Sequence, residues 1–367
     1  MGTFAALFVA ANVSSELVAA LARPELSIML CEGRHMSGGG IERHMQRIGV
    51  FDTAIATQNT GDLIIMEAAR EVLESLLVDR QLIYFPTHES VSGYGRGLQR
   101  LVSLNVACGT NLLHSHMGLV RQWRIGVREA FSYSKTVLMG VGWRSHRRRQ
   151  TDWYTRWLLR RVLSGSHIHS VRDSYAESKL REVGFQQVLN TGCHTTWSLT
   201  ETHCAAIPRT RGEEVIVVLT DYSPDLERDR QLVDLCLKMY GKVHFWPQGT
   251  GDLAYLRELG FQDRVTIVPP SLAAYRRVLA DTGRSLDYVG TRLHGGIYAL
   301  RHRRRSVIVG VDHRANEMGR DLNLPVIDRY AKPGELEQMV GGDRAVEIRL
   351  PLEKIQQWKR QFLNGPL

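Results

Sequence analysis

The chain has 367 residues, of which 43% are hydrophobic and 23% are charged, a balance typical of a soluble globular protein large enough for two domains. Lys and Arg number 47 against 38 Asp and Glu, and the formal net charge of +9 favours anionic partners: phosphates, anionic glycans, nucleic acid or lipid headgroups. Every apolar run is much shorter than the roughly 20 residues that span a bilayer, which argues against an integral membrane protein.

The five cysteines are scattered and form no C-x-x-C pair. This spacing argues against a structural zinc site and against a disulfide framework, and it fits a reducing cytoplasm. The first residues lack the basic region of a signal peptide. Residues 1–48 follow no pattern that we can interpret, so we treat them as an N-terminal extension of unknown role.

From residue 49 onward, short apolar runs alternate with helical stretches. This alternation predicts an α/β fold in which a parallel sheet carries helices on both faces. We assign 49–200 to a first domain of this kind. Its expected strands are 53–57, 81–85, 104–109, 136–142 and a strand end at 169–173, and its expected helices are 62–77, 153–164 and 174–185.

A polar segment then interrupts the alternation, and we predict a linker at 201–213. The alternation restarts and defines a second α/β domain, 214–349, followed by a C-terminal helix in 350–367. Ligands of open parallel sheets bind at the carboxyl ends of the strands, so the functional residues should follow strands and face an interdomain cleft. The alternating segments of the second domain are 215–220, 226–241, 242–246, 254–260, 265–270, 271–281, 286–290, 293–302 and 306–311.

The segment LDYVGTRLHGGIYALRH, residues 286–302, has the most informative pattern. A strand ends before Gly290 and a helix begins near Leu293, which places Arg292 and His294 at a helix N-terminus, where free N–H groups and the helix dipole attract anions. The two glycines after His294 allow close approach by a ligand or by another part of the backbone. The alternative is a buried histidine packed in the first turn of the helix.

Two other turns carry candidate residues. Arg172 ends a short strand in HSVRDSYAESKL and points toward the expected cleft, although pairing with a carboxylate on a helix face is the alternative. In TQNTGDLIIMEAA, the residues Asn59, Gly61 and Asp62 form a strand-to-helix turn, and Asp62 is the expected N-cap. The turn lacks a G-x-G-x-x-G fingerprint, and the chain lacks a P-loop, so a dinucleotide-binding domain and a P-loop kinase are weakly supported.

A fourth segment, VGVDHRANEMGRDLNLP, delivers Asp312, His313 and Arg314 to a loop, without the second histidine or carboxylate that a metal site needs, so we predict no metal. Basic clusters occur at 143–149 and 301–305. Neither has the aromatic context of a nucleic-acid-binding module. Both are interpreted as solvated loops and helix ends, with a contact to anionic lipid headgroups as the alternative.

The segments GTRLHGGIYAL, SVRDSYA, TQNTGD and VDHR together resemble the polysaccharide pyruvyltransferase family over roughly residues 50–345. The resemblance implies two Rossmann-like domains that face a cleft, as in B-type glycosyltransferases. It also implies an enzyme that transfers the enolpyruvyl carbons of phosphoenolpyruvate onto two hydroxyls of one sugar. The products would be a cyclic pyruvate ketal and phosphate, in exopolysaccharide or capsule biosynthesis.

The resemblance also implies roles for individual residues. Arg172, Arg292 and Leu293 would hold phosphoenolpyruvate, and His294 would be the acid/base residue. Arg314 stands where the family more often has Lys, and it keeps the positive charge with a different geometry. His194 stands where Pro is expected, a departure that concerns a turn near the linker.

Phosphoenolpyruvate carries about three negative charges near pH 7, which convergent arginines and a helix N-terminus would satisfy. The general base for the sugar hydroxyls stays open among Asp62, Glu89 and Asp221. The scheme needs no cofactor beyond phosphoenolpyruvate as donor, and its other partner is a glycan acceptor. We expect the enzyme to work in the cytoplasm. If its acceptor is a lipid-linked saccharide at the inner membrane face, Arg147–Arg149 and Arg303–Arg305 would make a peripheral contact with anionic membrane.

Two alternatives remain open at this stage. One is a glycosyltransferase of similar fold that uses a nucleotide-sugar, whose diphosphate would face the same basic residues. The other is a non-catalytic assembly protein of a polysaccharide pathway, against which the intact set of Arg172, Arg292 and His294 argues.

Overall fold

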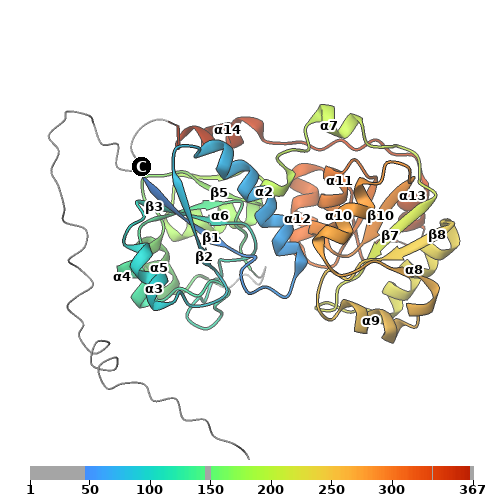
Figure 1. The fold of residues 1–367 in the computed structure, drawn as a ribbon, viewed down its shortest axis with the longest axis horizontal. Helices are drawn as coiled ribbons and strands as arrows, with labels where there is room; N and C mark the ends of the chain where they lie inside the picture. The colour runs from blue at the N-terminus through green and yellow to red at the C-terminus, as the bar shows by residue number, and fades with distance from the viewer. Residues whose placement is uncertain (1–45, 145–149, 333, 364–367) are drawn as a thin grey trace, which may run out of the picture. The chain divides into compact units, whose positions relative to one another are not determined.

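The computed structural model describes residues 46–144, 150–332 and 334–363 (Figure 1). These residues belong to one structural unit, Met45–Leu367, so the expected extension 1–48 lies outside the description except for its last three residues. Within the described ranges, the helices are too short or too polar to cross a membrane.

The first half of the chain forms a four-stranded parallel sheet in the order β2-β1-β3-β4. A separate parallel pair, β5 and β6, joins its edge through a bridge between Val141 and Val171. The strands are β1 (Arg47–Asp52), β2 (Gln81–Pro86), β3 (Leu104–Cys108), β4 (Thr136–Met139), β5 (His169–Val171) and β6 (Val188–Asn190).

The second half forms a six-stranded sheet in the order β12-β11-β10-β7-β8-β9, in which every pair is again parallel. The register pairs Gly290 with Val218, so the two central strands end side by side. The strands are β7 (Glu214–Val218), β8 (Lys242–Phe245), β9 (Thr266–Ile267), β10 (Leu286–Gly290), β11 (Ser306–Gly310) and β12 (Val326–Asp328).

Helices connect nearly all of these strands, as parallel pairing requires. In the first half they are α2 (Thr60–Leu76), α3 (Gly93–Gln99), α4 (Val127–Ser132), α5 (Trp153–Val162) and α6 (Ser174–Val183). The connecting segment holds the 3₁₀ turn η1 (His194–Thr196) and α7 (Glu201–Ala205). In the second half they are α8 (Leu226–Met239), α9 (Asp252–Leu259), η2 (Gln262–Arg264), α10 (Leu272–Ala280), α11 (Leu293–Arg301), α12 (His313–Leu322), α13 (Glu335–Gly341) and α14 (Leu352–Arg360).

Apolar clusters cover both faces of the second sheet. Neighbouring residues of β10 point to opposite sides: Tyr288 packs in a cluster with side chains of α10 and α11, and Val289 packs in a cluster with side chains of α8 and α9. Figure 1 shows the strands of this sheet with the same two helix pairs around them. The predicted parallel α/β architecture with helices on both faces is therefore confirmed.

The first predicted strand is wrong. Residues 53–56 form turns, and the strand is the preceding segment β1. Its last residue, Asp52, is buried, and its carboxylate accepts a hydrogen bond from the Ala54 backbone N–H (2.6 Å) and binds Arg70. An internal carboxylate acceptor of this kind turns the chain directly after the strand.

The C-terminal helix α14 packs on the first half of the chain. Trp358 is fully buried there, and its indole N–H donates to the Leu138 carbonyl (3.0 Å) in β4. The side chain of Gln361 bonds both backbone groups of Ile168. The chain thus returns to complete the core of the half in which it began.

The predicted basic surface at 303–305 is wrong for two of its three residues. Arg304 and Arg305 are buried, and Arg304 donates to the carbonyls of Leu279, Asp281 and Arg284. Arg305 forms an ion pair with Asp287 (2.9 Å). These guanidiniums join the start of β11 to α10 and β10 and are buried, so they cannot contact a lipid surface. The other predicted cluster, Arg147–Arg149, lies outside the described residues.

Candidate functional site

The turn between β10 and α11 places the strongest sequence motif at the carboxyl end of the second sheet. Arg292 is the N-cap residue, with an extended backbone, and α11 begins at Leu293. A Cβ on Gly296 would overlap Ile308, and one on Gly295 would press on Gln248 and Tyr288. The double glycine is therefore explained by the close packing of α11 on its own sheet.

Arg292 is buried and held by two carboxylates. Asp252, at the start of α9, is fully buried and binds Arg292 through both of its oxygens, and Asp221 binds the same guanidinium at 2.9 Å. Asp252 also accepts hydrogen bonds from the backbone N–H groups of Gln248, Gly249 and Asp221. The guanidinium is therefore oriented in advance by the turn that follows β8.

Arg172 follows β5 and is fully buried. Its Nε donates to Asp173 (3.2 Å) and one terminal nitrogen donates to Asn111, while the other, Nη1, has no hydrogen-bond partner among the described residues. A Cβ on Gly142 would overlap the guanidinium, so that glycine makes room for it. An unpartnered donor on a buried guanidinium is costly and is a group that an anionic ligand would satisfy.

His294 lies in the first turn of α11, almost completely buried, with its Nε2 3.8 Å from the Cys193 sulfur. Burial holds the pKa of His294 well below its ordinary value of about 6.5, and the nearby guanidiniums of Arg172 and Arg314 lower it further. The imidazole is therefore neutral at pH 7 in the ligand-free protein. Leu293 packs in the apolar cluster behind it.

The turn before α2 faces Arg292 from the first half of the chain. Asn59 is the N-cap and accepts from the Gly61 N–H (3.1 Å), so the expected N-cap role of Asp62 is wrong. Asp62 instead points into the cavity described below, where the Thr57 hydroxyl donates to it (2.6 Å) and burial raises its pKa. The Gln248 side-chain amide donates to Asn59 (2.9 Å), which ties this turn to the one that positions Arg292.

The loop after β11 adds a third cation. Asp312 is the N-cap of α12 and binds Arg314, which lowers the pKa of the carboxyl group. Arg314 also donates to the hydroxyl of Tyr222, and the ring of Tyr222 lies 5.3 Å from the Arg314 guanidinium carbon and 5.1 Å from that of Arg292. Tyr222 thereby separates and orients two arginines.

One cavity of about 740 Å³ collects most of these groups. Of the predicted site residues, Asn59, Asp62, Arg292 and Arg314 line it, as does the base candidate Asp221. Arg172, Leu293 and His294 are buried outside its lining, although the charges of Arg172 and Arg314 act on His294. Glu89 lies outside the lining, whereas its neighbour His88 belongs to it, as do Thr110, Asn111, Gln122, Arg144, Tyr222, Gly249, Thr250, Asp312 and His313.

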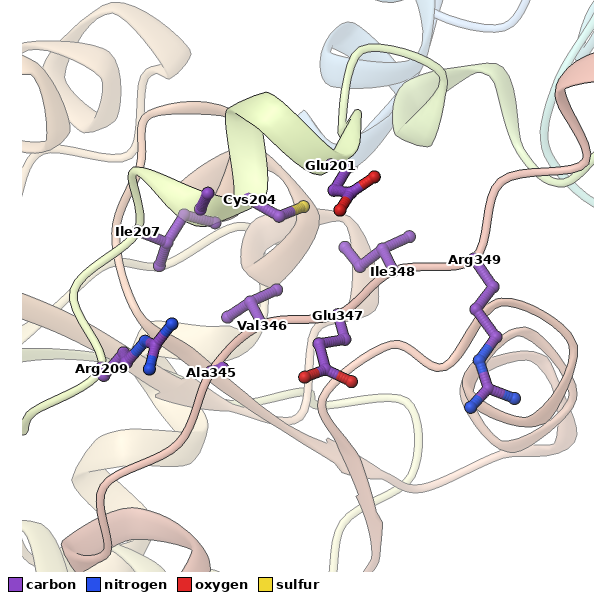
Figure 2. A pocket seen from close by; sticks show the side chains of 10 residues that line it. Glu201, Cys204, Ile207, Arg209, Ala345, Val346, Glu347, Ile348 and Arg349 are labelled. Atoms are coloured by element: carbon purple, nitrogen blue, oxygen red, sulfur yellow. The ribbon is translucent and has the colours of Figure 1, made fainter.

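A smaller cavity of about 400 Å³ lies between α7 and the extended segment 345–349. Figure 2 shows the apolar side chains of Ile207, Val346 and Ile348 lining this cavity, with the carboxylates of Glu201 and Glu347 beside them. None of the residues predicted from motifs lies there. The larger cavity is therefore the candidate active site.

Sequence reasoning missed Asp252 and Tyr222. Asp252 stands in QGTGD, where a strand end, two glycines and an acidic residue precede a helix, the same pattern that drew attention to Asp62. Tyr222 follows β7 in a polar loop without a comparable signal. Its role is visible only once the folded chain places its ring against two guanidiniums.

Comparisons with known proteins agree on the fold and the family. Staphylococcus aureus MnaA, solved with UDP, shares 10% identity and a TM-score of 0.50, covering 88% of this chain and 99% of MnaA. Escherichia coli heptosyltransferase WaaC shares 13% identity with a TM-score of 0.38, covering 72% of this chain and 88% of WaaC. No curated protein sequence matches the chain.

The likeness to MnaA concerns the fold alone, and together with the two parallel sheets it confirms the expected Rossmann-like α/β architecture. A family model adds a finding at the level of sequence. It matches residues 59–313, more than two thirds of the chain, from the turn at Asn59 to the loop that holds Asp312. On that match, the chain belongs to the polysaccharide pyruvyl transferase family.

Proposed function

We propose that this protein transfers the enolpyruvyl carbons of phosphoenolpyruvate to two hydroxyls of one glycan sugar, forming a cyclic ketal and releasing phosphate. The observation that carries the proposal is the arrangement of one cavity, in which Arg292 and Arg314 face the carboxylate of Asp62. Membership of the pyruvyl transferase family supports it. Exopolysaccharide or capsule biosynthesis is the expected setting.

The charges around the cavity suit the donor. Phosphoenolpyruvate carries a phosphate and a carboxylate, and arginine binds both in a bidentate manner. Arg292 and Arg314 reach the cavity directly, and the free Nη1 of Arg172 would gain a partner from a ligand that enters beside Asn111. Asp221 is exposed enough to release Arg292, whereas the buried Asp252 keeps the guanidinium in place.

The proton chemistry follows from two groups. The first sugar hydroxyl bonds to C2 of the donor and gives its proton to Asp62, whose raised pKa improves it as a base. A donor that enters beyond the present lining to bind Arg172 would also approach His294; the donor's negative charges raise the pKa of His294, which then supplies the proton that C3 gains. The bond between C2 and the phosphate oxygen then breaks, the second hydroxyl bonds to C2, and its proton balances the released phosphate.

The test is to incubate the purified protein with phosphoenolpyruvate and a panel of lipid-linked and synthetic glycosides. Phosphate release and a gain of one pyruvate ketal in the acceptor mass would support the proposal. Arg172→Lys is a useful variant because it keeps the charge but loses the forked hydrogen bonding, so donor binding should weaken without loss of the fold. Transfer from nucleotide-sugars in place of phosphoenolpyruvate would refute the proposal in favour of a glycosyltransferase.

A further inference from the structure

The first half of the chain exposes large apolar side chains on one side of α4 and α5. Trp153, at the start of α5, is 79% exposed, and Phe131, near the end of α4, is 65% exposed. Leu119 and Val127, in and after the loop that leads to α4, are also exposed. Single exposed apolar residues are common, but large aromatic ones that gather on one surface mark an interaction site.

These side chains form one continuous patch. The ring of Tyr154 lies 6.1 Å from that of Trp153 and 6.0 Å from that of Trp157, whose ring in turn lies 5.9 Å from Phe131. The same Tyr154 would lie 3.2 Å from a Cβ on Gly118, which connects the aromatic row to the loop that carries Leu119. We call these residues, with the exposed side chains of α4 and α5, the α4–α5 face.

The α4–α5 face is strongly cationic. Between residues 119 and 161, the described part of the chain contains eight Lys and Arg and two Asp and Glu, and one of these cations, Arg156, pairs with Glu182 of α6. Both acidic residues have internal partners: Glu129 accepts from the Gly126 N–H (2.9 Å), and Asp152 binds His116 (3.0 Å) and caps α5. Exposed arginines in the described part of this segment are Arg121, Arg124, Arg128, Arg144, Arg160 and Arg161.

Exposed aromatic rings beside exposed arginines suit binding to a bilayer surface. Aromatic side chains prefer the headgroup level of a membrane, and nearby cations are attracted to anionic lipids. The guanidinium carbon of Arg161 lies 4.6 Å from the ring centre of Phe131, which places a cation and an apolar ring at one spot. We propose that the α4–α5 face docks this protein on an anionic lipid bilayer.

The same segment reaches the candidate active site. Gln122 and Arg144 line the large cavity, and the Arg144 guanidinium donates to the Gln122 side chain (2.9 Å). Docking through the α4–α5 face therefore brings the wall of the cavity toward the lipid headgroups. On the proposed function, on which this step rests, the acceptor glycan is carried by a membrane lipid.

The experiment measures docking without any donor or acceptor. The full chain is sedimented with phosphatidylcholine vesicles and with vesicles that contain one third phosphatidylglycerol. We expect binding to the anionic vesicles alone, and a loss of about 30-fold in the Arg121→Gln/Arg128→Gln variant, equivalent to about 2 kcal/mol at about 1 kcal/mol for each cation. Phe131→Ala/Trp153→Ala should weaken binding at least tenfold, because each substitution removes a ring that enters the headgroup layer.

A spectroscopic readout identifies the face directly. Trp153 is far more exposed than the fully buried Trp123, Trp143 and Trp246, so brominated lipids should quench its fluorescence first. Quenching should fall sharply in Trp153→Phe while binding persists, with the remainder coming from the partly buried Trp157. Matched controls are Tyr330→Ala and Arg277→Gln, which remove an exposed ring and an exposed cation from the second half of the chain.

Three results would overturn the inference. One is equal sedimentation with neutral and anionic vesicles, and another is an equal loss of binding in the control variants. The third is a dimer that dissociates in Phe131→Ala/Trp153→Ala while vesicles are ignored, which would assign the face to a second copy of the chain. Failure of pyruvyl transfer in the donor assay would leave the docking result unaffected, so the two proposals can fail separately.

Discussion

Replacing Asp221 by Asn tests how the arginines of the cavity are held before a donor arrives. The carboxylate of Asp221 binds Arg292 at 2.9 Å, and the Asp221 backbone N–H donates to Asp252. The donor must therefore compete with Asp221 for one edge of the guanidinium. Because Asp252 still holds the other edge, Asp221→Asn should leave Arg292 in position.

The size of the effect follows from exposure. The side chain of Asp221 is 37% exposed, so its ion pair with the buried Arg292 should contribute about 1 kcal/mol. This value lies between that of a surface ion pair and that of a buried hydrogen bond to a charged group. At 1.4 kcal/mol for each factor of ten, Asp221→Asn should tighten phosphoenolpyruvate binding about fivefold. The turnover number should change little, because we assign the base to Asp62.

Calorimetric titration with phosphoenolpyruvate and steady-state phosphate release measure the two quantities. Asp263→Asn, which removes the same charge from an exposed 3₁₀ turn outside the cavity lining, is the matched control. A hundredfold fall in turnover would show that Asp221 is the general base. Weaker donor binding would show that it organises the cavity, and either result would refute the reasoning.

Three further predictions concern the buried groups. His294→Gln should lower turnover by about 100-fold or more while donor affinity stays near that of the wild type, since the free imidazole is neutral; unchanged turnover would remove His294 from the mechanism. Gly142→Ala should displace Arg172 and weaken phosphoenolpyruvate binding about tenfold by calorimetry, and an unaltered affinity would show that Arg172 is a structural residue. Burial lowers the pKa of His169 and His194 to about 4 in the folded protein, so the unfolded chain binds more protons between about pH 4 and pH 6.5. Over this range, urea denaturation should show that the free energy of unfolding falls by about 1.4 kcal/mol per histidine for each pH unit below 6.5. A free energy of unfolding that does not change with pH would contradict this.

The sequence predicted the parallel α/β fold because its signals are local. Alternating apolar runs mark buried strands, and the helix over 174–183 ends at Gly184 in a left-handed conformation, as its sequence indicates. The strand assigned to 53–57 failed for an equally local reason. TAIAT is apolar enough for a strand, but the neighbouring Asp52 accepts a hydrogen bond from its backbone and makes it a turn.

Contacts between distant segments were not predictable in the same way. Arg292 and Arg314 were expected from motifs, but their fixed orientation depends on Asp252 and Tyr222, which approach from other loops. The burial of Arg304 likewise depends on carbonyls of the α10 region that no charge pattern reveals. A run of arginines in the sequence indicates positive charge, and only the fold decides whether that charge reaches solvent.

Ionic strength should separate the two anion-binding surfaces of this protein. Arg292 and Arg314 in the cavity lining, and Arg172 outside it, each bind a carboxylate, so an incoming donor exchanges partners in a largely buried setting. On the α4–α5 face the exposed arginines attract anions across water, where charges are screened within about 8 Å at physiological salt and about 3 Å at 1 M. Raising salt should therefore release the protein from anionic vesicles at concentrations that change phosphoenolpyruvate affinity only slightly. A donor affinity that falls in parallel with vesicle binding would mean that these arginines act through long-range attraction. It would refute the inference that the donor replaces their carboxylate partners.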